Sequence, residues 1–524
     1  MKIRSLVLLV HLVLLVKSAP PMGTEQDGKG CNKQYFDQDS FVCTCSVTSG
    51  CDSVEPVGTI KDDEAVVYTT SLDGDRLTRT VENFGIYKGH TNSSYLIELV
   101  SNTDWLQKII GFGGAITDSV QVVYDIAARN RLNTLLLDQY YGPNSIEYSL
   151  GRIPIGSSDF SETEWSYLEE PEDYLLSKFS LAKDKKVPLV RAILQKNPEI
   201  KLFASAWSAP GWMKDTGRMR GGGKLQGGLN GIYYLTYAKY ILKFFKAYAA
   251  QGINFWGMTV QNEPATGAVA DYRWQTMYLS PAMQRDFVDK RLAPMLKSDN
   301  VTKDILIMAH DDQRSGILEA AKEIYSKKVE HEVDGLGVHW YSASEYEPLT
   351  DVHKIKPDKF ILSTEACNAD HDDEHLPLFG SWEYAQKYAH DIIQNLRNYV
   401  AGWTDWNIWL NEQGGPNWVG NFVDAPIIVD TYKGVFYKQP MYYIMGHFSK
   451  FIPPNSYRLK LNQNQENKEL ETVGFVTPGL KLVLVAHNWS KDKTFELLVK
   501  KSNSKSAVKI SLGPKSIKTI IFNN

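Results

Sequence analysis

Eight short apolar segments, each closing on polar residues, recur through the middle of the chain at residues 108–119, 148–160, 201–210, 254–264, 304–313, 333–342, 359–368 and 401–411. Continuous apolar runs of this length are typical of strands that a sheet buries on both faces. The stretches between them, such as 233–252 and 381–400, carry apolar residues at helical spacing. Eight strand–helix units predict an α/β fold with a closed (β/α)8 TIM barrel. An open doubly wound sheet is the alternative.

The flanking regions follow a different pattern. Residues 55–100 and 456–524 alternate apolar and polar positions with period two and show little helical spacing. This alternation predicts antiparallel strands, and the two pieces from opposite ends of the chain are expected to form one β-sandwich. The sandwich is expected to be structural.

The first nineteen residues have the composition of a secretory signal peptide. Two basic residues, Lys2 and Arg4, precede an apolar run from Leu6 to Val16, and small residues follow at Ser18 and Ala19. That run is too short to span a membrane. We therefore expect residues 1–19 to be removed on entry to the secretory pathway.

Composition narrows the class of protein. Hydrophobic residues make up 43% of the chain, charged residues 23%, and the formal net charge is −4. These values are ordinary for a globular protein. Because the chain has no excess of basic residues, nucleic acid is not an expected partner.

Cysteine positions agree with a secretory route. Four of the five cysteines lie close together, at Cys31, Cys43, Cys45 and Cys51, and two disulfides with any of three pairings are expected there. A zinc cluster is the alternative, but the spacings are not CxxC pairs. Cys367 is left over and is read as inert packing. Sequons mark candidate glycosylation sites at Asn92, Asn300 and Asn488.

The candidate chemistry lies where the predicted strands end. A barrel of this type carries its site at the carboxyl ends of its strands. The fourth segment delivers Asn262 and Glu263 there, and the seventh delivers Glu365. Two carboxylates about 5 Å apart fit a retaining glycosidase, whereas about 6.5 to 9.5 Å leaves room for the water of an inverting one.

Other strand ends supply groups that suit a sugar. Asp159 can accept hydrogen bonds from hydroxyl groups, and Asn262 can contact a 2-hydroxyl. Flat apolar faces for a pyranose ring are offered by Trp207, His339, Trp340, Tyr341, Trp403 and Trp406. Taken singly, such carboxylates are more often salt-bridged and such aromatics are more often core. Their concurrence at strand ends favours the functional interpretation.

Ordered motifs along the chain, among them "RIPIGSSDF", "ASAWSAPGWMK", "TVQNEP", "STEAC", "GWTDWN" and "GGPNWVGNFVDAPIIVD", resemble the glucosylceramidases of glycoside hydrolase family 30. The resemblance runs from about Cys31 to the end. It implies a retaining β-glucosidase acting on glucosylceramide, with Glu263 as acid/base and Glu365 as nucleophile. It implies sugar binding by Asp159, Trp207, Asn262, Trp406 and Asn421, orientation of the nucleophile by His339 and Tyr341, and no cofactor or metal.

The same resemblance implies disulfides Cys31–Cys43 and Cys45–Cys51. It implies a small disulfide-bearing β domain (28–56 plus 408–439), a β-sandwich (57–104 plus 456–524) and the catalytic barrel (105–407 plus 440–455). It also implies a lysosomal enzyme that contacts anionic membrane surfaces with a saposin-type activator.

Two segments depart from the family pattern: "RMRGGGKLQGG" after Met213 and "NADHDDEHLPLFGS" after Cys367. Both follow barrel strands, so they are expected to frame the entrance and affect the aglycone, with Tyr272 and Trp274 lining an apolar entrance. The alternatives are a secreted β-glucosidase or β-xylosidase acting on soluble or plant-derived glycosides, and an inactive glycolipid-binding protein.

Overall fold

The computed structural model describes residues 30–86, 94–101, 105–342, 345–370 and 376–524. The expected signal peptide, residues 1–19, and the sequon residue Asn92 lie outside the described residues. Among the helices that are described, none combines the length and the apolar character needed to cross a membrane.

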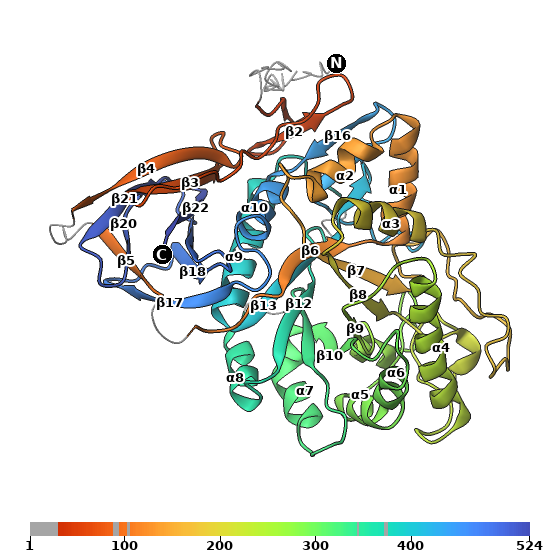
Figure 1. Cartoon of the computed structure of the whole chain (residues 1–524). Coiled ribbons are helices and arrows are strands. Elements are labelled where there is room, and N and C mark those ends of the chain that lie inside the picture. The colour runs from red at the N-terminus through yellow and green to blue at the C-terminus, as the bar shows by residue number, and fades with distance from the viewer. Residues whose placement is uncertain (1–29, 87–93, 102–104, 343–344, 371–375) are drawn as a thin grey trace, which may run out of the picture.

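The centre of the molecule is a closed barrel of eight parallel strands (Figure 1). Each strand falls within one of the eight apolar segments or overlaps it, which confirms the barrel and excludes the open sheet. The strands follow one another around the barrel in chain order. They are β6 (Gly111–Ala115), β7 (Leu150–Ile155), β8 (Lys201–Ala206), β9 (Gly257–Thr259), β10 (Leu306–Gln313), β11 (Gly335–His339), β12 (Phe360–Glu365) and β13 (Val400–Asn407).

Helices connect the barrel strands and cover their outer face. The two helices anticipated at 233–252 and 381–400 are α4 and α9, and Ser381 caps α9 by accepting from the backbone N–H of Tyr384. The α-helices are α1 (Asp118–Arg129), α2 (Asn133–Tyr141), α3 (Val187–Lys196), α4 (Ile232–Ala249), α5 (Pro281–Phe287), α6 (Ala293–Lys297), α7 (Ile317–Ile324), α8 (Glu347–Ile355), α9 (Trp382–Arg397) and α10 (Pro440–Ser449). Short turns of other helix types are η1 (Gly211–Met213), η2 (Pro264–Ala268), η3 (Val288–Leu292) and η4 (Arg314–Gly316).

Apolar side chains fill the lower part of the barrel interior. Leu150, Phe203, Met308 and Leu362 form a buried cluster there, with Phe360 packed against it. A filled interior of this kind leaves space only at the carboxyl ends of the strands.

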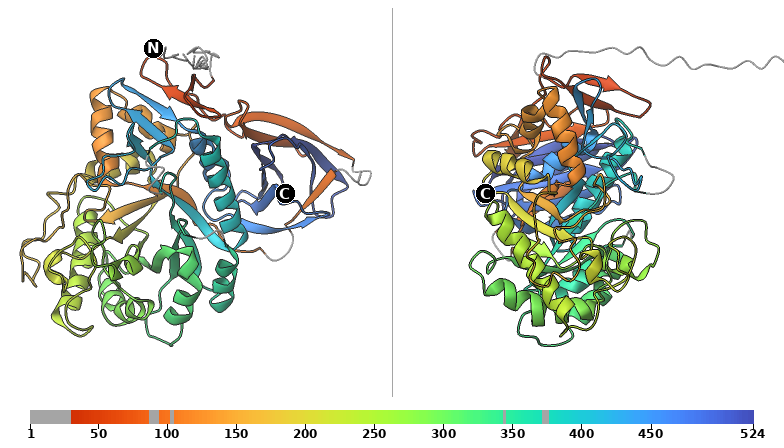
Figure 2. Two further views of the ribbon diagram at one scale, coloured as in Figure 1. Left: turned by 180° about the vertical axis from the view of Figure 1, so that it is seen from behind. Right: turned by 90° about the vertical axis from the view of Figure 1, so that its right-hand side faces the viewer.

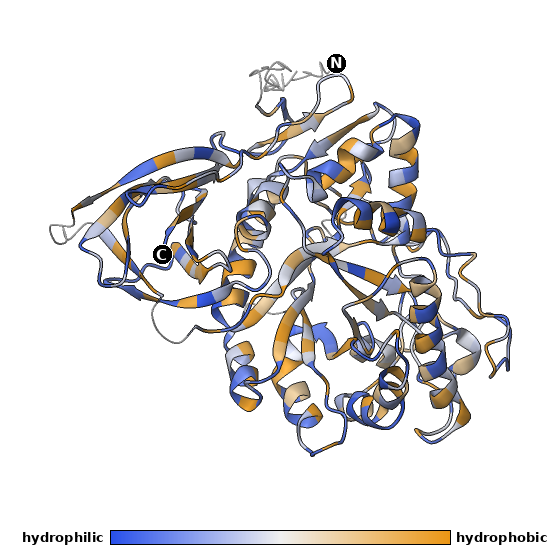
Figure 3. Ribbon diagram, in the orientation of Figure 1, coloured by the Kyte–Doolittle hydropathy of each residue, from blue (hydrophilic) through white to orange (hydrophobic). Residues whose placement is uncertain are grey.

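A nine-strand β-sandwich lies beside the barrel, and Figure 2 shows it from two further sides. Strands β4 and β17 pair within both of its sheets and so close the two layers into one. Figure 3 shows polar and apolar residues alternating along its strands, as the period-two pattern predicted. The strands are β3 (Glu64–Ser71), β4 (Thr78–Ile86), β5 (Ser94–Val100), β17 (Tyr457–Gln463), β18 (Leu470–Val476), β19 (Lys481–Asn488), β20 (Phe495–Lys501), β21 (Ser506–Leu512) and β22 (Ser516–Asn523).

One strand pair of the sandwich corrects the expectation of antiparallel strands. β5 pairs with β20 in parallel, from Ser94 opposite Glu496 to Leu99 opposite Lys501. These strands come from opposite ends of the chain, so no hairpin fixes their relative direction.

The Asn488 sequon in β19 was misread as a glycosylation site. The Asn488 side chain is fully buried, and its amide donates to the backbone carbonyls of Lys493, Leu512 and Gly513. A glycan on that nitrogen would break these bonds and has no room. Asn300 is exposed, and its glycosylation stays a prediction.

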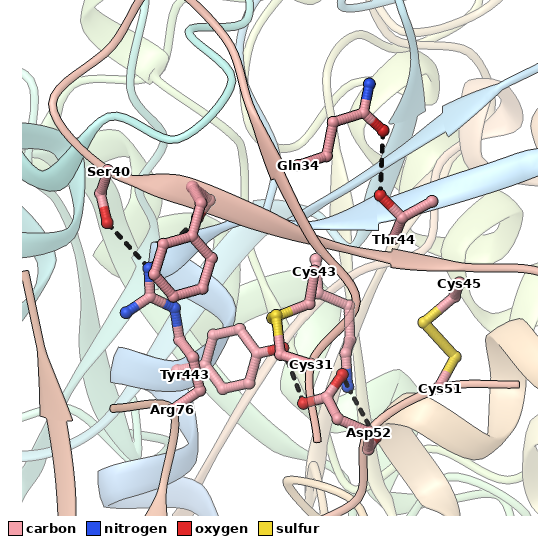
Figure 4. The surroundings of a disulfide bond; sticks show 12 residues. Cys31, Gln34, Ser40, Cys43, Thr44, Cys45, Cys51, Asp52, Arg76 and Tyr443 are labelled. Atoms are coloured by element: carbon pink, nitrogen blue, oxygen red, sulfur yellow. Dashed lines mark hydrogen bonds and ion pairs between the residues drawn. A yellow bond between two sulfur atoms is a disulfide. The ribbon is translucent and has the colours of Figure 1, made fainter. Parts of the chain in front are cut away.

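A third, five-stranded sheet joins the N-terminal segment to the region after the barrel, in the order β1-β2-β16-β15-β14. Its disulfides are Cys31–Cys43 and Cys45–Cys51, which confirms the pairing that the family resemblance implies (Figure 4). Asp52 connects this sheet to α10 by accepting from Tyr443 at 2.8 Å. Its strands are β1 (Lys33–Tyr35), β2 (Phe41–Cys45), β14 (Trp409–Asn411), β15 (Ile427–Asp430) and β16 (Val435–Lys438).

Candidate active site

A cavity of about 250 Å³ opens at the carboxyl ends of the barrel strands. Eight of the nine residues expected to act on or bind a sugar line it, and the ninth, His339, lies fully buried directly behind the two glutamates. The lining residues are Asp159, Trp207, Asn262, Glu263, Tyr272, Trp274, Gln313, Tyr341, Glu365, Cys367, Asp370, Trp406, Asn421 and Val423.

Glu263 is held where β9 turns into η2. Its backbone adopts a left-handed conformation (φ 41°, ψ 57°), which residues other than glycine rarely adopt. Its N–H donates to the carbonyl of Asp311 at 2.9 Å. Pro264 then starts the next turn. One carboxylate oxygen accepts from Gln313 Nε2 at 2.8 Å and lies 3.3 Å from His339 Nδ1. The strained backbone therefore aims this carboxylate into the cavity.

Glu365 ends β12 and also lines the cavity. Tyr341 donates its hydroxyl to one carboxylate oxygen at 3.0 Å, and Arg152 forms an ion pair with the other. Arg152 is fully buried and Tyr341 is half-buried, and their two contacts leave Glu365 little freedom to rotate. Burial raises the pKa of the Glu365 carboxyl, while the charges of His339 and Arg152 act against that rise.

The two glutamates lie close enough to act on one bond. One oxygen from each and one nitrogen of His339 lie within 4.8 Å of one another.

A buried network of charges supports the pair from below. Asp311 accepts from Arg152 at 2.9 Å and from His339 at 3.1 Å, and also from the hydroxyls of Ser205, Thr259 and Thr364. Burial alone would raise the pKa of Asp311, but the charge of Arg152 and the bond from His339 hold it well below its usual range. Burial alone would lower the pKa of His339, but Glu365, Asp311 and Glu263 outweigh it and raise the pKa to about 10.

This network was missed at the sequence level. Arg152 and Asp311 lie within apolar strand segments, and a charged residue inside such a run was the available signal. A charge is buried only with a partner, so each of these two residues required the other.

Among the described residues, Glu263, His339 and Glu365 form a group that could hold a metal ion. The donor set argues against that role. Both ring nitrogens of His339 contact carboxylates, its raised pKa keeps it protonated, and the Arg152 cation already occupies Glu365. A metal ligand must be deprotonated, so these residues fit a charge-balanced carboxylate pair better than a cation.

Five further residues that line the cavity are suited to a sugar ring: Trp207, Trp406, Asn262, Asn421 and Asp159. The rings of Trp207 and Trp406 stack with centroids 5.2 Å apart. Asn262 accepts from Arg152 through its side-chain oxygen at 2.8 Å, which leaves its amide hydrogens for a ligand. Asn421 donates to Asp159 at 3.1 Å. Burial raises the pKa of Asp159 to about 7, against the effect of that bond.

Three of the residues offered as flat sugar-binding faces have other roles. Trp403 is fully buried and donates its ring N–H to Asp391, and Trp340 donates to the carbonyl of Cys367. The ring nitrogens of His339 contact carboxylates.

The free cysteine, Cys367, is buried. Its thiol lies 3.4 Å from the Tyr341 hydroxyl, and burial raises its pKa well above the ordinary value, as an inert thiol requires.

Of the two segments expected to frame the entrance, one is fully described. Residues 219–223 lie against 267–278, which carries Tyr272 and Trp274. In the other segment, residues 371–375 lie outside the described residues, and Asp370 reaches the cavity.

Comparisons with known proteins identify the family of the chain. Residues 109–452 match the glycosyl hydrolase family 30 TIM-barrel domain, and residues 455–520 match the glycosyl hydrolase family 30 beta sandwich domain. "Putative glucosylceramidase 3" of Caenorhabditis elegans is 40% identical over 94% of this chain and 95% of its own length. "Lysosomal acid glucosylceramidase" of Mus musculus is 39% identical over 88% of this chain and 90% of its own length.

Solved structures share the fold of the chain. SrfJ from Salmonella typhimurium superposes with a TM-score of 0.78 at 26% identity, covering 88% of this chain and all of that one. The endo-beta1,6-glucanase BT3312 has the same fold, with a TM-score of 0.75 at 24% identity over 88% of this chain and all of that one. The chain therefore belongs to glycosyl hydrolase family 30 and is a glycoside hydrolase.

Proposed function

We propose that this enzyme is a retaining β-glucosidase that hydrolyses glucosylceramide to glucose and ceramide by double displacement. The observation that carries the retaining mechanism is the 4.8 Å limit on the distance between Glu263 and Glu365 oxygens. Retaining enzymes place their carboxyl groups about 5 to 5.5 Å apart, whereas inverting enzymes need about 6.5 to 9.5 Å.

In the first displacement, a Glu365 oxygen attacks the anomeric carbon while the bond to the aglycone oxygen breaks. Glu263 gives its proton to that leaving oxygen, and a glucosyl ester on Glu365 results. Tyr341 and Arg152 hold Glu365 for direct attack. In the second displacement, Glu263 takes a proton from water, which attacks the anomeric carbon and releases glucose and Glu365.

The glucose ring is proposed to occupy the cavity itself. Trp207 and Trp406 offer apolar faces to its C–H groups, and Asp159 with Asn421 contacts its hydroxyls. Asn262 is proposed to donate to the 2-hydroxyl, a contact that strengthens as the oxocarbenium ion forms.

The aglycone is proposed to leave past Glu263. A cavity of about 250 Å³ suits a single sugar ring, so a lipid must extend beyond it. Tyr272 and Trp274 lie on the loop that follows Glu263 and line the cavity. The names of the relatives at 40% and 39% identity support glucosylceramide as the substrate.

We further propose that the enzyme acts in the lysosome, which it reaches by the secretory pathway. The name of the mouse relative supports the lysosome, and two disulfides fit an oxidising route of export. Contact with anionic membrane surfaces and a saposin-type activator remain predictions from the family.

The test is sugar release by the purified enzyme across a pH series, measured as glucose from the glucosides and as xylose from the xyloside. Substrates are glucosylceramide in mixed micelles with and without anionic lipid, a small aryl β-glucoside and a small aryl β-xyloside. The proposal requires glucose from glucosylceramide. Hydrolysis of the small glycosides alone would replace it with a β-glucosidase or β-xylosidase of soluble substrates. No release from any substrate would leave a glycolipid-binding protein.

A further inference from the structure

Lys214 is a buried lysine whose ammonium donates hydrogen bonds to three backbone carbonyls. Its side chain has no exposure, and its ammonium donates to the carbonyls of Met219 at 2.9 Å, Gly221 at 3.0 Å and Thr276 at 2.6 Å. An ammonium carries three donors, so this cage satisfies all of them. Burial lowers the pKa of Lys214 to about 8, which still leaves it charged in an acidic compartment.

The three carbonyls belong to two separate loops. Met219 and Gly221 lie in the loop after β8, which differs from the family pattern, and Thr276 lies in the loop after β9. Lys214 therefore fastens one entrance loop to the other. The apolar stem of the lysine is buried as well.

Glycines allow the two loops to approach backbone to backbone. Gly221, Gly222 and Gly223 donate their N–H groups to the carbonyls of Trp274, Ala270 and Gly267. A Cβ on Gly222 would lie 2.5 Å from the carbonyl oxygen of Val269 and 2.6 Å from that of Gly267. Contacts this short do not occur in real structures, so only glycine fits there.

The loop that Lys214 holds is the one that shapes the cavity. It starts at Glu263 and is tied to it, because the Thr266 hydroxyl donates to the Glu263 carbonyl at 2.6 Å. Thr266 and Thr276 share a hydrogen bond of 2.6 Å between their hydroxyls. Tyr272 and Trp274 lie between these anchors, with ring centroids 4.8 Å apart, and both line the cavity.

We propose that Lys214 is a positioning residue for aglycone specificity: its ammonium fastens the loop after β8 to Thr276 and so fixes Tyr272 and Trp274 as an apolar wall for the aglycone. The proposal rests on the proposed function, since it needs a glycoside with an apolar aglycone. Its physical basis is that removal of the ammonium leaves three buried carbonyls without a hydrogen-bond donor. This costs more free energy than moving the loops apart so that water can reach the carbonyls.

Lys214→Met keeps the apolar stem and removes the charge, so it is the primary variant. Lys224→Met makes the same chemical change at an exposed position of the same loop and is the matched control. The measured quantity is the ratio of kcat/KM for octyl β-glucoside to kcat/KM for a small aryl β-glucoside. Both substrates give the same glucosyl-enzyme, so the ratio reports only the steps in which the aglycone is still present.

Lys214→Met is expected to lower this ratio by about tenfold, which is the loss in kcat/KM expected when an apolar part of the substrate loses its contact with the enzyme. Lys224→Met is expected to leave the ratio unchanged. Lys214→Met should also speed tryptic cleavage after the exposed Arg218 and Arg220, because the freed loop fits a protease. Gly222→Ala should also push the two loops apart, because the added methyl group would clash with the carbonyl oxygens of Val269 and Gly267. It should lower the ratio in the same direction and decides the question if Lys214→Met does not fold.

An unchanged ratio in a folded Lys214→Met variant would overturn the inference. Equal losses on both substrates would also overturn it, because they would indicate a general structural role. If the unaltered enzyme hydrolyses neither glucoside, the proposed function fails, and faster tryptic cleavage in Lys214→Met would still show that the cage holds the loops.

Discussion

The candidate catalytic cavity and the groove between the barrel and the sandwich each contain a buried carboxylate, Asp159 and Glu471, and the pKa values of these two carboxyls are shifted in opposite directions. The groove lies between α9 and strands β17 and β18, and at about 1050 Å³ it is much larger than the cavity of about 250 Å³. Its central carboxylate is Glu471. Size alone would therefore have pointed to the wrong place.

Glu471 has every hydrogen bond that a carboxylate can use. It accepts from His390 at 2.7 Å, Gln394 and Trp489 at 2.6 Å, and His487 at 3.2 Å. Burial would raise its pKa, but the bonds from His390 and His487 outweigh it and hold the pKa well below the ordinary value. This carboxylate joins α9 to the sandwich and has no capacity left for a ligand.

Asp159 in the cavity accepts fewer hydrogen bonds than Glu471 does. Its recorded side-chain donors are the amides of Asn421 at 3.1 Å and Asn417 at 3.3 Å, and burial raises its pKa to about 7. Its unused acceptor capacity faces the space where a sugar would bind. The comparison teaches that unmet hydrogen-bonding capacity, held at a cost in stability, locates the active site better than cavity size does.

The largest effect is expected at Glu365, where the variant Glu365→Gln removes the proposed nucleophile. The value of kcat/KM for an aryl β-glucoside should fall by about 10⁴-fold or more. Circular dichroism and the melting temperature should show that the fold is retained, because glutamine still accepts from Tyr341. Residual activity near that of the unaltered enzyme would show that Glu365 takes no part in the reaction.

Glu263→Gln is expected to be nearly as damaging, but with a dependence on the leaving group. Loss of a general acid costs about 10² to 10⁴-fold when the leaving oxygen needs a proton. An aryl glucoside whose phenol is strongly acidic needs little protonation, so its first displacement should be largely spared. Burst kinetics measure this, and an equal loss for all leaving groups would assign Glu263 another role.

Asp159→Asn separates activity from stability. We expect kcat/KM to fall by about tenfold to a hundredfold, because an acceptor for sugar hydroxyls is lost. The folded-state pKa of about 7 lies above the ordinary 3.8, so the native carboxyl increasingly destabilises the fold as the pH rises from 3.8 through 7. The variant should therefore gain up to about 4 kcal/mol in the free energy of unfolding at pH 8 and nothing near pH 3. Denaturant titrations at the two pH values check this, and a loss of stability at pH 8 would contradict it.

Glu471→Gln should give the reverse result, with the smallest effect on catalysis. The value of kcat/KM should stay within about twofold, while the free energy of unfolding at pH 6 falls by about 2 kcal/mol. The lowered folded-state pKa means that the native enzyme keeps this stabilisation above pH 4.5 and loses it as the pH falls further. The variant should lack that loss, and a melting curve series from pH 3 to 6 shows whether it does.

Much of the architecture could be predicted because it depends on local pattern. The eight strand segments follow from continuous apolar runs, and Glu263 and Glu365 follow from their position at strand ends. Because both residues follow strands of one parallel barrel, they are expected at the same end of it, although the backbone turn after β9 is also needed to aim Glu263.

What could not be predicted depends on partners that are distant in the sequence. Arg152 and Asp311 are understood only when several strands are closed into a barrel around them. The acceptors of Lys214 are backbone carbonyls, which every residue carries, so no pattern marks them. Asn488 was misread because a sequon gives no information on burial.

The central claim is that Glu365 bonds covalently to the sugar, and trapping the glucosyl-enzyme tests it most directly. A 2-deoxy-2-fluoro-β-glucoside with a good leaving group forms this ester and hydrolyses slowly, because the fluorine destabilises the oxocarbenium ion. Peptic digestion and mass spectrometry should find one fluoroglucosyl group per chain, on the peptide that contains Glu365. A label on another residue, or no label together with release of α-glucose as the first product, would contradict the account.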